Sequence, residues 1–112
     1  MRMEIRRIVM FTSRMEQMAA FYRDVIGLEL KTNERGWKEF DAGGIMLALH
    51  NGISEVGRRA PKMVFYSSDV AATREMLLKR GAKMGKVKSS AGLDLCEGTD
   101  PDGNQFQVSN RK

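Results

Sequence analysis

The predicted order of secondary structure occurs twice, and this repeat limits the fold more than any other feature of the chain. A strand, a helix and three further strands appear two times within 112 residues. The first set is predicted over residues 5–12, 13–27, 28–33, 37–41 and 45–50, and the second over 62–67, 69–80, 82–88, 93–98 and 105–109. Each half alone is too small to bury a stable core. We therefore expect one α+β domain of two βαβββ modules, with module one at 1–52, a polar linker at 53–60 and module two at 61–112.

The first helix has the most regular apolar pattern. Its apolar residues recur at spacings of three and four, which predicts one buried helix face, and they are Met15, Met18, Ala19, Tyr22 and Ile26. Ser13 and Glu16 fit a capping box at its start, and Gly27 is expected to end it. The second helix is predicted to place Val70, Thr73 and Leu77 on its inner side, with Met76 left open.

Charge and composition limit the partners and the compartment. The formal charge of +5 favours anionic partners. The one dense basic stretch, residues 79–88, contains no aromatic residue to stack on bases, so we expect a solvated surface and no nucleic-acid partner. The apolar runs are too short for a membrane span, and the charged start does not fit an export signal. Cys96 is either a reactive thiol or, as we favour, a partly buried strand cysteine, which suits a cytoplasmic protein.

Two segments carry a resemblance to a known family. The segment FYRDVIG at 21–27 closes the first helix, and DPDGN at 100–104 precedes the last strand. Together with the repeated order of elements, they resemble the vicinal oxygen chelate superfamily, which includes glyoxalase I, extradiol dioxygenases, fosfomycin-resistance enzymes and bleomycin-resistance proteins. The resemblance covers nearly the whole chain. It implies curved mixed sheets that form a cleft, and often a homodimer.

The resemblance also implies where a metal would bind. Enzymes of this family hold a divalent ion with residues on the first and fourth strands of each module, typically His or Gln and Glu, and use it as a Lewis acid. Matching by distance from the helices places these positions at Arg7, Ala48, Lys62 and Gln107. Only Gln107 offers a plausible ligand atom, and the chain contains a single histidine. We therefore expect no metal and no other cofactor.

Strand alternation predicts which other side chains face the cleft. The cleft-facing sets are Ile5, Arg7, Val9 and Phe11; Met46, Ala48 and His50; Lys62, Val64 and Tyr66; and Gln105, Gln107 and Ser109. The opposite faces are more purely apolar and are expected to pack under the helices. Within the cleft, the predicted ligand-binding residues are Arg7, Phe11, His50, Lys62, Tyr66 and Gln107.

The role of each of these residues is open at this stage. Arg7 and Lys62 either bind a carboxylate, phosphate or enolate directly, or reach solvent or pair with acids such as Glu39, Asp41 or Asp94. His50 is either a general base or a structural residue at a strand end. Tyr66 either donates to a ligand or is part of the cleft wall. Trp37 either stacks on a ligand or packs in the core or a dimer contact.

Two classes of function remain. The leading hypothesis is a metal-free module that binds a small anionic or aromatic molecule. The alternative is an enzyme of the glyoxalase family, of the lyase, isomerase or dioxygenase type, that acts with or without a divalent metal. Metal-dependent glyoxalase or dioxygenase activity is disfavoured, because the expected ligand positions lack ligand atoms.

Overall fold

The computed structural model describes residues 2, 4–53 and 61–112, which form two compact units, Met1–Arg58 and Arg59–Lys112. Each unit is described by itself. The predicted linker at 53–60 lies outside the described residues except for Ile53, which is exposed. That the two units form one domain stays a prediction.

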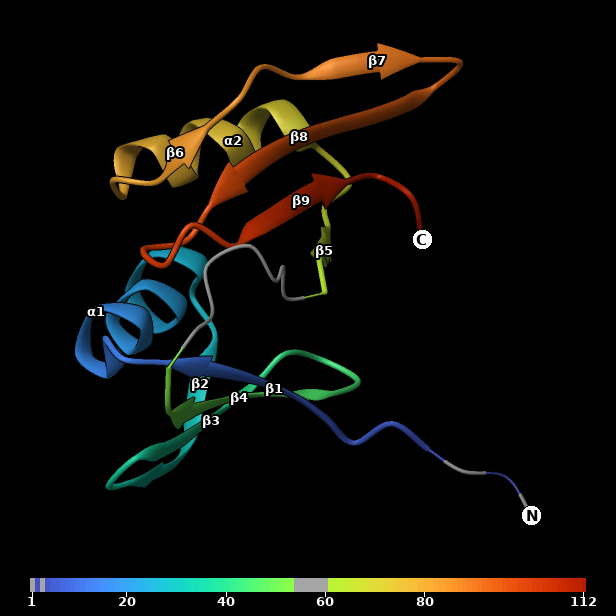
Figure 1. Cartoon of the computed structure of the whole chain (residues 1–112). Coiled ribbons are helices and arrows are strands. Elements are labelled where there is room, and N and C mark those ends of the chain that lie inside the picture. The colour runs from blue at the N-terminus through green and yellow to red at the C-terminus, as the bar shows by residue number, and fades with distance from the viewer. Residues whose placement is uncertain (1, 3, 54–60) are drawn as a thin grey trace. The chain divides into compact units, whose positions relative to one another are not determined.

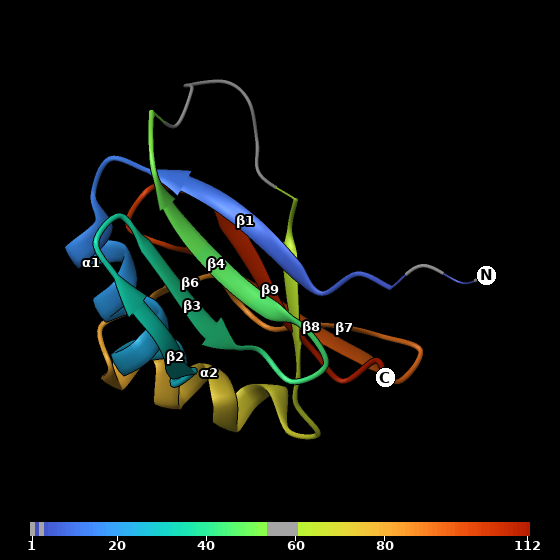
Figure 2. The same cartoon turned by 90° about the horizontal axis from the view of Figure 1, so that it is seen from below.

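The first unit contains a four-stranded mixed sheet with one helical segment (Figures 1 and 2). Its strands are β1 (Arg7–Thr12), β2 (Glu29–Glu34), β3 (Trp37–Asp41) and β4 (Met46–Asn51). They lie in the order β1-β4-β3-β2, with β1 parallel to β4 and the other pairs antiparallel. The helix α1 (Met15–Ala20) packs against β4. Ile5 was predicted to lie in the first strand, but it lies outside β1 and is 75% exposed.

The second unit repeats this arrangement. It contains β5 (Met63–Tyr66), α2 (Val70–Lys79), β6 (Lys83–Met84), β7 (Lys88–Ser90), β8 (Leu93–Thr99) and β9 (Gln105–Ser109). The strands lie in the order β5-β9-β8-β6, with β7 also paired to β8, and β5 is parallel to β9. The predicted α+β fold of two βαβββ-like modules is therefore confirmed.

The strand predicted over 82–88 is wrong as a single element, because the chain leaves the sheet between β6 and β7. Met84 lies opposite Gly98, and Lys88 lies opposite Leu95. Four residue steps on one side thus face three on the other, and the extra residue interrupts the ladder. At the break, the Gly85 N–H still donates to the carbonyl of Glu97 at 2.7 Å. The pattern of apolar residues cannot reveal such a shift in register.

The first helix begins and continues differently from the prediction. The capping box of Ser13 and Glu16 is wrong: Arg14 is the N-cap residue, and no side chain caps the helix. The chain enters α1 through the buried Thr12, whose hydroxyl accepts a hydrogen bond from the Arg14 N–H at 2.9 Å. After α1 the chain widens into the π-helix η1 (Phe21–Ile26), and Gly27 ends it with φ of +88°, as predicted.

The second helix agrees closely with its prediction. The carboxylate of Asp69 caps α2 by accepting a hydrogen bond from the Ala72 N–H at 3.0 Å. Val70 and Leu77 are buried, whereas Met76 is exposed and does not belong to the inner face. The helix packs against β6, β8 and β9.

The two sheets bury the faces predicted to lie under the helices. The buried side chains of these faces are Met10, Phe40, Leu47 and Leu49 in the first unit and Cys96, Phe106 and Val108 in the second. Cys96 is thus a buried strand cysteine, as favoured. No helix in the described ranges is long and apolar enough to cross a membrane.

Candidate functional site

Three rings form a row on the exposed face of the first sheet. In the sheet register Phe11 lies opposite His50, and His50 lies opposite Trp37 on the other side. The Phe11 and His50 ring centroids are 5.3 Å apart, and those of Trp37 and His50 are 5.6 Å apart, both edge to face. Phe11 is 52% exposed. The row, which we call the aromatic row, therefore offers aromatic surface to solvent or to a ligand.

Next to the aromatic row, Glu39 on β3 accepts hydrogen bonds from neighbouring side chains, chiefly those of Trp37 and Arg7. Its Oε2 lies 3.2 Å from the Arg7 Nε, and its Oε1 accepts a hydrogen bond from the Trp37 indole N–H at 2.9 Å. The Glu39 side chain is only 13% exposed. The hydrogen bond from Trp37, and then that from Arg7, lower the pKa of Glu39, although burial opposes them. Of the alternatives left open for Arg7, the structure shows pairing with an acid.

The second sheet has an equivalent cluster around Glu97. The Lys62 Nζ lies 3.4 Å from the Glu97 Oε1, and the Gln107 amide donates to the same oxygen at 3.3 Å. Glu97 lies opposite Gln107 in the sheet, as Glu39 lies opposite Ala48 in the first. The two glutamates therefore hold equivalent positions in the two modules.

Glu97 was not among the acids that the sequence analysis proposed as partners of Arg7 and Lys62. Glu97 lies on the strand before the last strand of its module, as Glu39 does in the first module, and this was the signal in the sequence. The equivalence becomes visible only in the register between the strands. Tyr66 on β5 is 50% exposed and lies under the ammonium of Lys112, 5.9 Å from the ring centroid.

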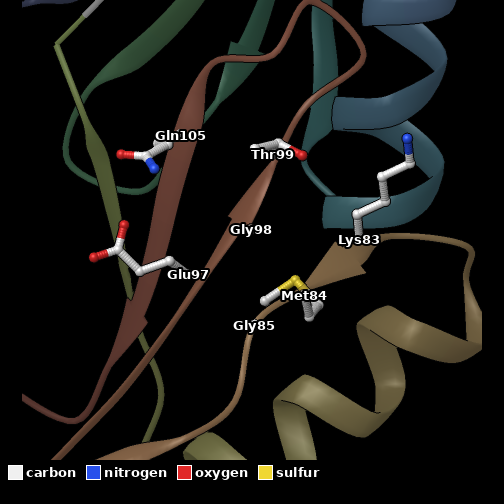
Figure 3. Close-up of a pocket in the computed structure, with 7 residues that line it drawn as sticks. All are labelled: Lys83, Met84, Gly85, Glu97, Gly98, Thr99 and Gln105. Atoms are coloured by element: carbon white, nitrogen blue, oxygen red, sulfur yellow. The ribbon is translucent and has the colours of Figure 1, made fainter.

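The second unit also contains a pocket between its strands (Figure 3). Its volume is about 260 Å³, and its lining residues are Lys83, Met84, Gly85, Glu97, Gly98, Thr99 and Gln105. Figure 3 shows the Met84 side chain beside Gly98. A Cβ atom on Gly98 would lie 2.6 Å from the Met84 Sδ and 2.6 Å from the Phe106 Cζ, so a glycine is required there. Sequence reasoning did not find this pocket.

The family model described as Glyoxalase/Bleomycin resistance protein/Dioxygenase superfamily matches residues 4–108. The chain belongs to this superfamily. A search of curated proteins finds no match.

Solved structures of the same fold agree with the membership in the glyoxalase/bleomycin resistance/dioxygenase superfamily. UcmS2 is 17% identical with a TM-score of 0.81, and the match covers 99% of this chain and 100% of that one. TnmS3, an antibiotic binding protein from Streptomyces sp. CB03234, is 19% identical with a TM-score of 0.80, covering 95% and 93%. A lactoylglutathione lyase from Agrobacterium tumefaciens is 21% identical with a TM-score of 0.75, covering 95% and 92%. At these identities the likeness shows the fold.

The residues at the superfamily's metal positions do not fit a divalent ion. Arg7 presents a guanidinium, Lys62 an ammonium and Ala48 a buried methyl group, and none of these is a ligand at neutral pH. Gln107 donates its Nε2 hydrogen to Glu97, and its amide oxygen is the one neutral ligand atom that these four positions offer, too few for a site. Within residues 2, 4–53 and 61–112, no group of three or more His, Cys, Asp and Glu side chains is arranged to hold a metal ion.

Proposed function

We propose that this superfamily member is a binding protein that holds a small aromatic molecule against the exposed face of a sheet, without a divalent metal. One observation carries the proposal. The faces on which relatives hold their ion expose apolar and aromatic side chains here, namely Val9, Phe11, Val64 and Tyr66. Exposed apolar surface of this kind is typical of a ligand site.

The charges on these faces support an aromatic ligand more than an anionic one. Arg7 and Lys62 are each already paired with a glutamate, so the charge that they offer to a ligand is largely balanced. An anion would have to compete with Glu39 or Glu97 for the same donors. A flat aromatic ring would instead contact Phe11 on the first sheet, or Tyr66 on the second, and leave the ion pair of that sheet in place.

Among the structural neighbours, the antibiotic binding protein TnmS3 supports a binding role for the fold. A homodimer in the cytoplasm remains part of the proposal, and sedimentation velocity of the purified protein would test the dimer. Metal analysis of the same preparation tests the absence of an ion. One tightly held divalent ion per chain would contradict the proposal and favour the enzyme alternative.

Binding of a neutral bicyclic aromatic, quinolin-2-one, tests the site directly. Its addition should shift the backbone amide NMR signals of β1, β4, β5 and β9. Phe11→Ala should weaken the affinity about tenfold, because it removes a large contact surface. Leu78→Ala is the matched control, since Leu78 is also an exposed apolar residue but lies on α2. Equal affinity in the parent and Phe11→Ala would overturn the proposal.

Arg7→Ala gives a second arm with the same probe. Because Arg7 is paired with Glu39, its removal should change the affinity for the neutral aromatic less than Phe11→Ala does. The affinity for acetate should be the same in Arg7→Ala as in the parent, because a guanidinium that is paired with Glu39 does not bind the anion. Strong acetate binding that depends on Arg7 would instead favour an anionic ligand on this face.

A further inference from the structure

The pocket of the second unit has a cross-strand row of polar side chains on one wall. Lys83 on β6 lies directly opposite Thr99 on β8, and Thr99 lies opposite Gln105 on β9. Directly opposed residues of an antiparallel pair point to the same face of a sheet. The side chains of Lys83, Thr99 and Gln105 therefore start from the same face of the sheet, and Figure 3 shows Thr99 between the Gln105 amide on one side and the Lys83 ammonium on the other.

Lys83 differs from Arg7 and Lys62 because its charge is not balanced. It is exposed, and no described residue forms an ion pair or hydrogen bond with its ammonium. The other charged residue of the pocket is Glu97, whose Oε1 is bound by Lys62 and Gln107. Figure 3 shows the Glu97 carboxylate directed away from Lys83. A negative group placed at Lys83 would therefore meet no opposing free carboxylate in the pocket lining.

The surroundings of the pocket are also basic. Residues 61–112 contain nine lysines and arginines against six aspartates and glutamates. Lys86 and Lys88, which follow the pocket residue Gly85, are exposed. Such a local excess raises the concentration of anions near the surface without selecting among them. Selection would come from the side chains that line the pocket.

We infer that this pocket binds the carboxylate of a small organic anion, with Lys83 as its counter-charge and the Thr99 hydroxyl as a second donor. Hydrogen bonds from a cationic donor to a carboxylate are stronger than those between neutral groups. The pocket is open to solvent, and its volume of about 260 Å³ leaves room for a single-ring or short-chain carboxylate. This second site adds to the proposed function and does not rest on it.

Benzoate and its neutral analogue benzamide test the inference, because they differ mainly in charge. Benzoate should shift the amide signals of Gly85, Gly98, Thr99 and Gln105, and benzamide should bind this pocket about tenfold more weakly, as expected when one charge-assisted hydrogen bond is lost. Lys83→Ala should weaken benzoate binding by a similar factor, and so should Lys83→Gln, a second variant that keeps a polar side chain but removes its charge. Lys86→Ala removes the same charge two residues beyond Met84, outside the pocket lining, and should keep most of the affinity.

The possible outcomes distinguish a failure of the Lys83 site from a failure of the site at the aromatic row. Equal weakening by Lys83→Ala and Lys86→Ala would show general electrostatic attraction and overturn the inference. Equal affinity for benzoate and benzamide, or the absence of any benzoate-induced shift in the pocket, would also overturn it. Neither result bears on the quinolin-2-one shifts of β1 and β4, which test the proposed function by themselves. Conversely, benzoate binding at Lys83 with no aromatic binding at Phe11 would overturn only the proposed function.

Discussion

The ring of Phe11 packs directly on Gly52, and the contact leaves no room for a methyl group between them. A Cβ atom on Gly52 would lie 2.7 Å from the Phe11 Cδ1 and 3.4 Å from its Cβ. The Gly52 N–H also donates to the carbonyl of Thr12, which holds the end of β4 beside β1. The glycine thus sets the position of the exposed ring that we propose to contact the ligand.

Gly52→Ala should therefore displace the Phe11 ring. Because Phe11 is half exposed, the ring can move aside, and we expect a loss of stability of no more than about 1 kcal/mol. The affinity for quinolin-2-one should fall severalfold, and the ring-current shifts on His50 should change. Gly44→Ala is the control, since a Cβ atom there meets nothing within 4 Å. Equal affinity in Gly52→Ala and Gly44→Ala would contradict the role of this contact.

The pairing around Glu39 predicts how stability depends on pH. The hydrogen bond from Trp37 and the ion pair with Arg7 lower the pKa of Glu39 in the folded chain. A lowered pKa stabilises the fold above the ordinary glutamate value of about 4.3 and loses this effect as the pH falls through the folded value. Glu39→Gln should therefore lower the free energy of unfolding at pH 7 and converge with the parent at low pH, as measured by urea denaturation. A constant difference between pH 7 and pH 3 would contradict this assignment.

The burial of Cys96 predicts that its thiol reacts slowly in the folded protein. Its side chain is fully buried, and burial raises the pKa of the thiol, so the reactive thiolate is both rare and shielded. The native protein should react with a disulfide reagent at pH 8 at least about a hundredfold more slowly than the urea-unfolded chain. The chain has a single cysteine, so the signal reports this site alone. Native labelling as fast as that of the unfolded chain would show that the strand opens readily.

Asp100 holds the turn before β9 with several hydrogen bonds. Its Oδ1 accepts from the backbone N–H groups of Asp102 and Asn104 at 3.0 Å and 2.9 Å, and its Oδ2 accepts from the Asn104 amide at 2.9 Å. Asp100→Ala should lower the free energy of unfolding by roughly 2–3 kcal/mol, because three partly buried donors lose their partner. Asp69→Ala, which removes one exposed helix cap, should cost about 1 kcal/mol. The reverse order of the two losses would contradict the role given to the turn.

Much of the fold could be predicted because its signals are local. The period of two along the strands separated the buried Leu47 and Phe106 from the exposed Phe11 and Tyr66. The capping box at Ser13 failed because Thr12, one residue earlier, supplies the hydrogen bond that turns the chain into the helix. The strand over 82–88 failed because its break depends on the register against β8.

By itself, the sequence determined the repeated order of elements, the outward position of the candidate site residues and the lack of ligand atoms at Arg7, Ala48 and Lys62. Only the tertiary structure decided that Arg7 pairs with Glu39 and Lys62 with Glu97, residues that are 32 and 35 positions apart. It also decided that Lys83, alone among the charged pocket residues, keeps an unbalanced charge within the described ranges. The physical reason is that alternation along one strand fixes which way a side chain points, whereas its neighbour is chosen by the register between strands.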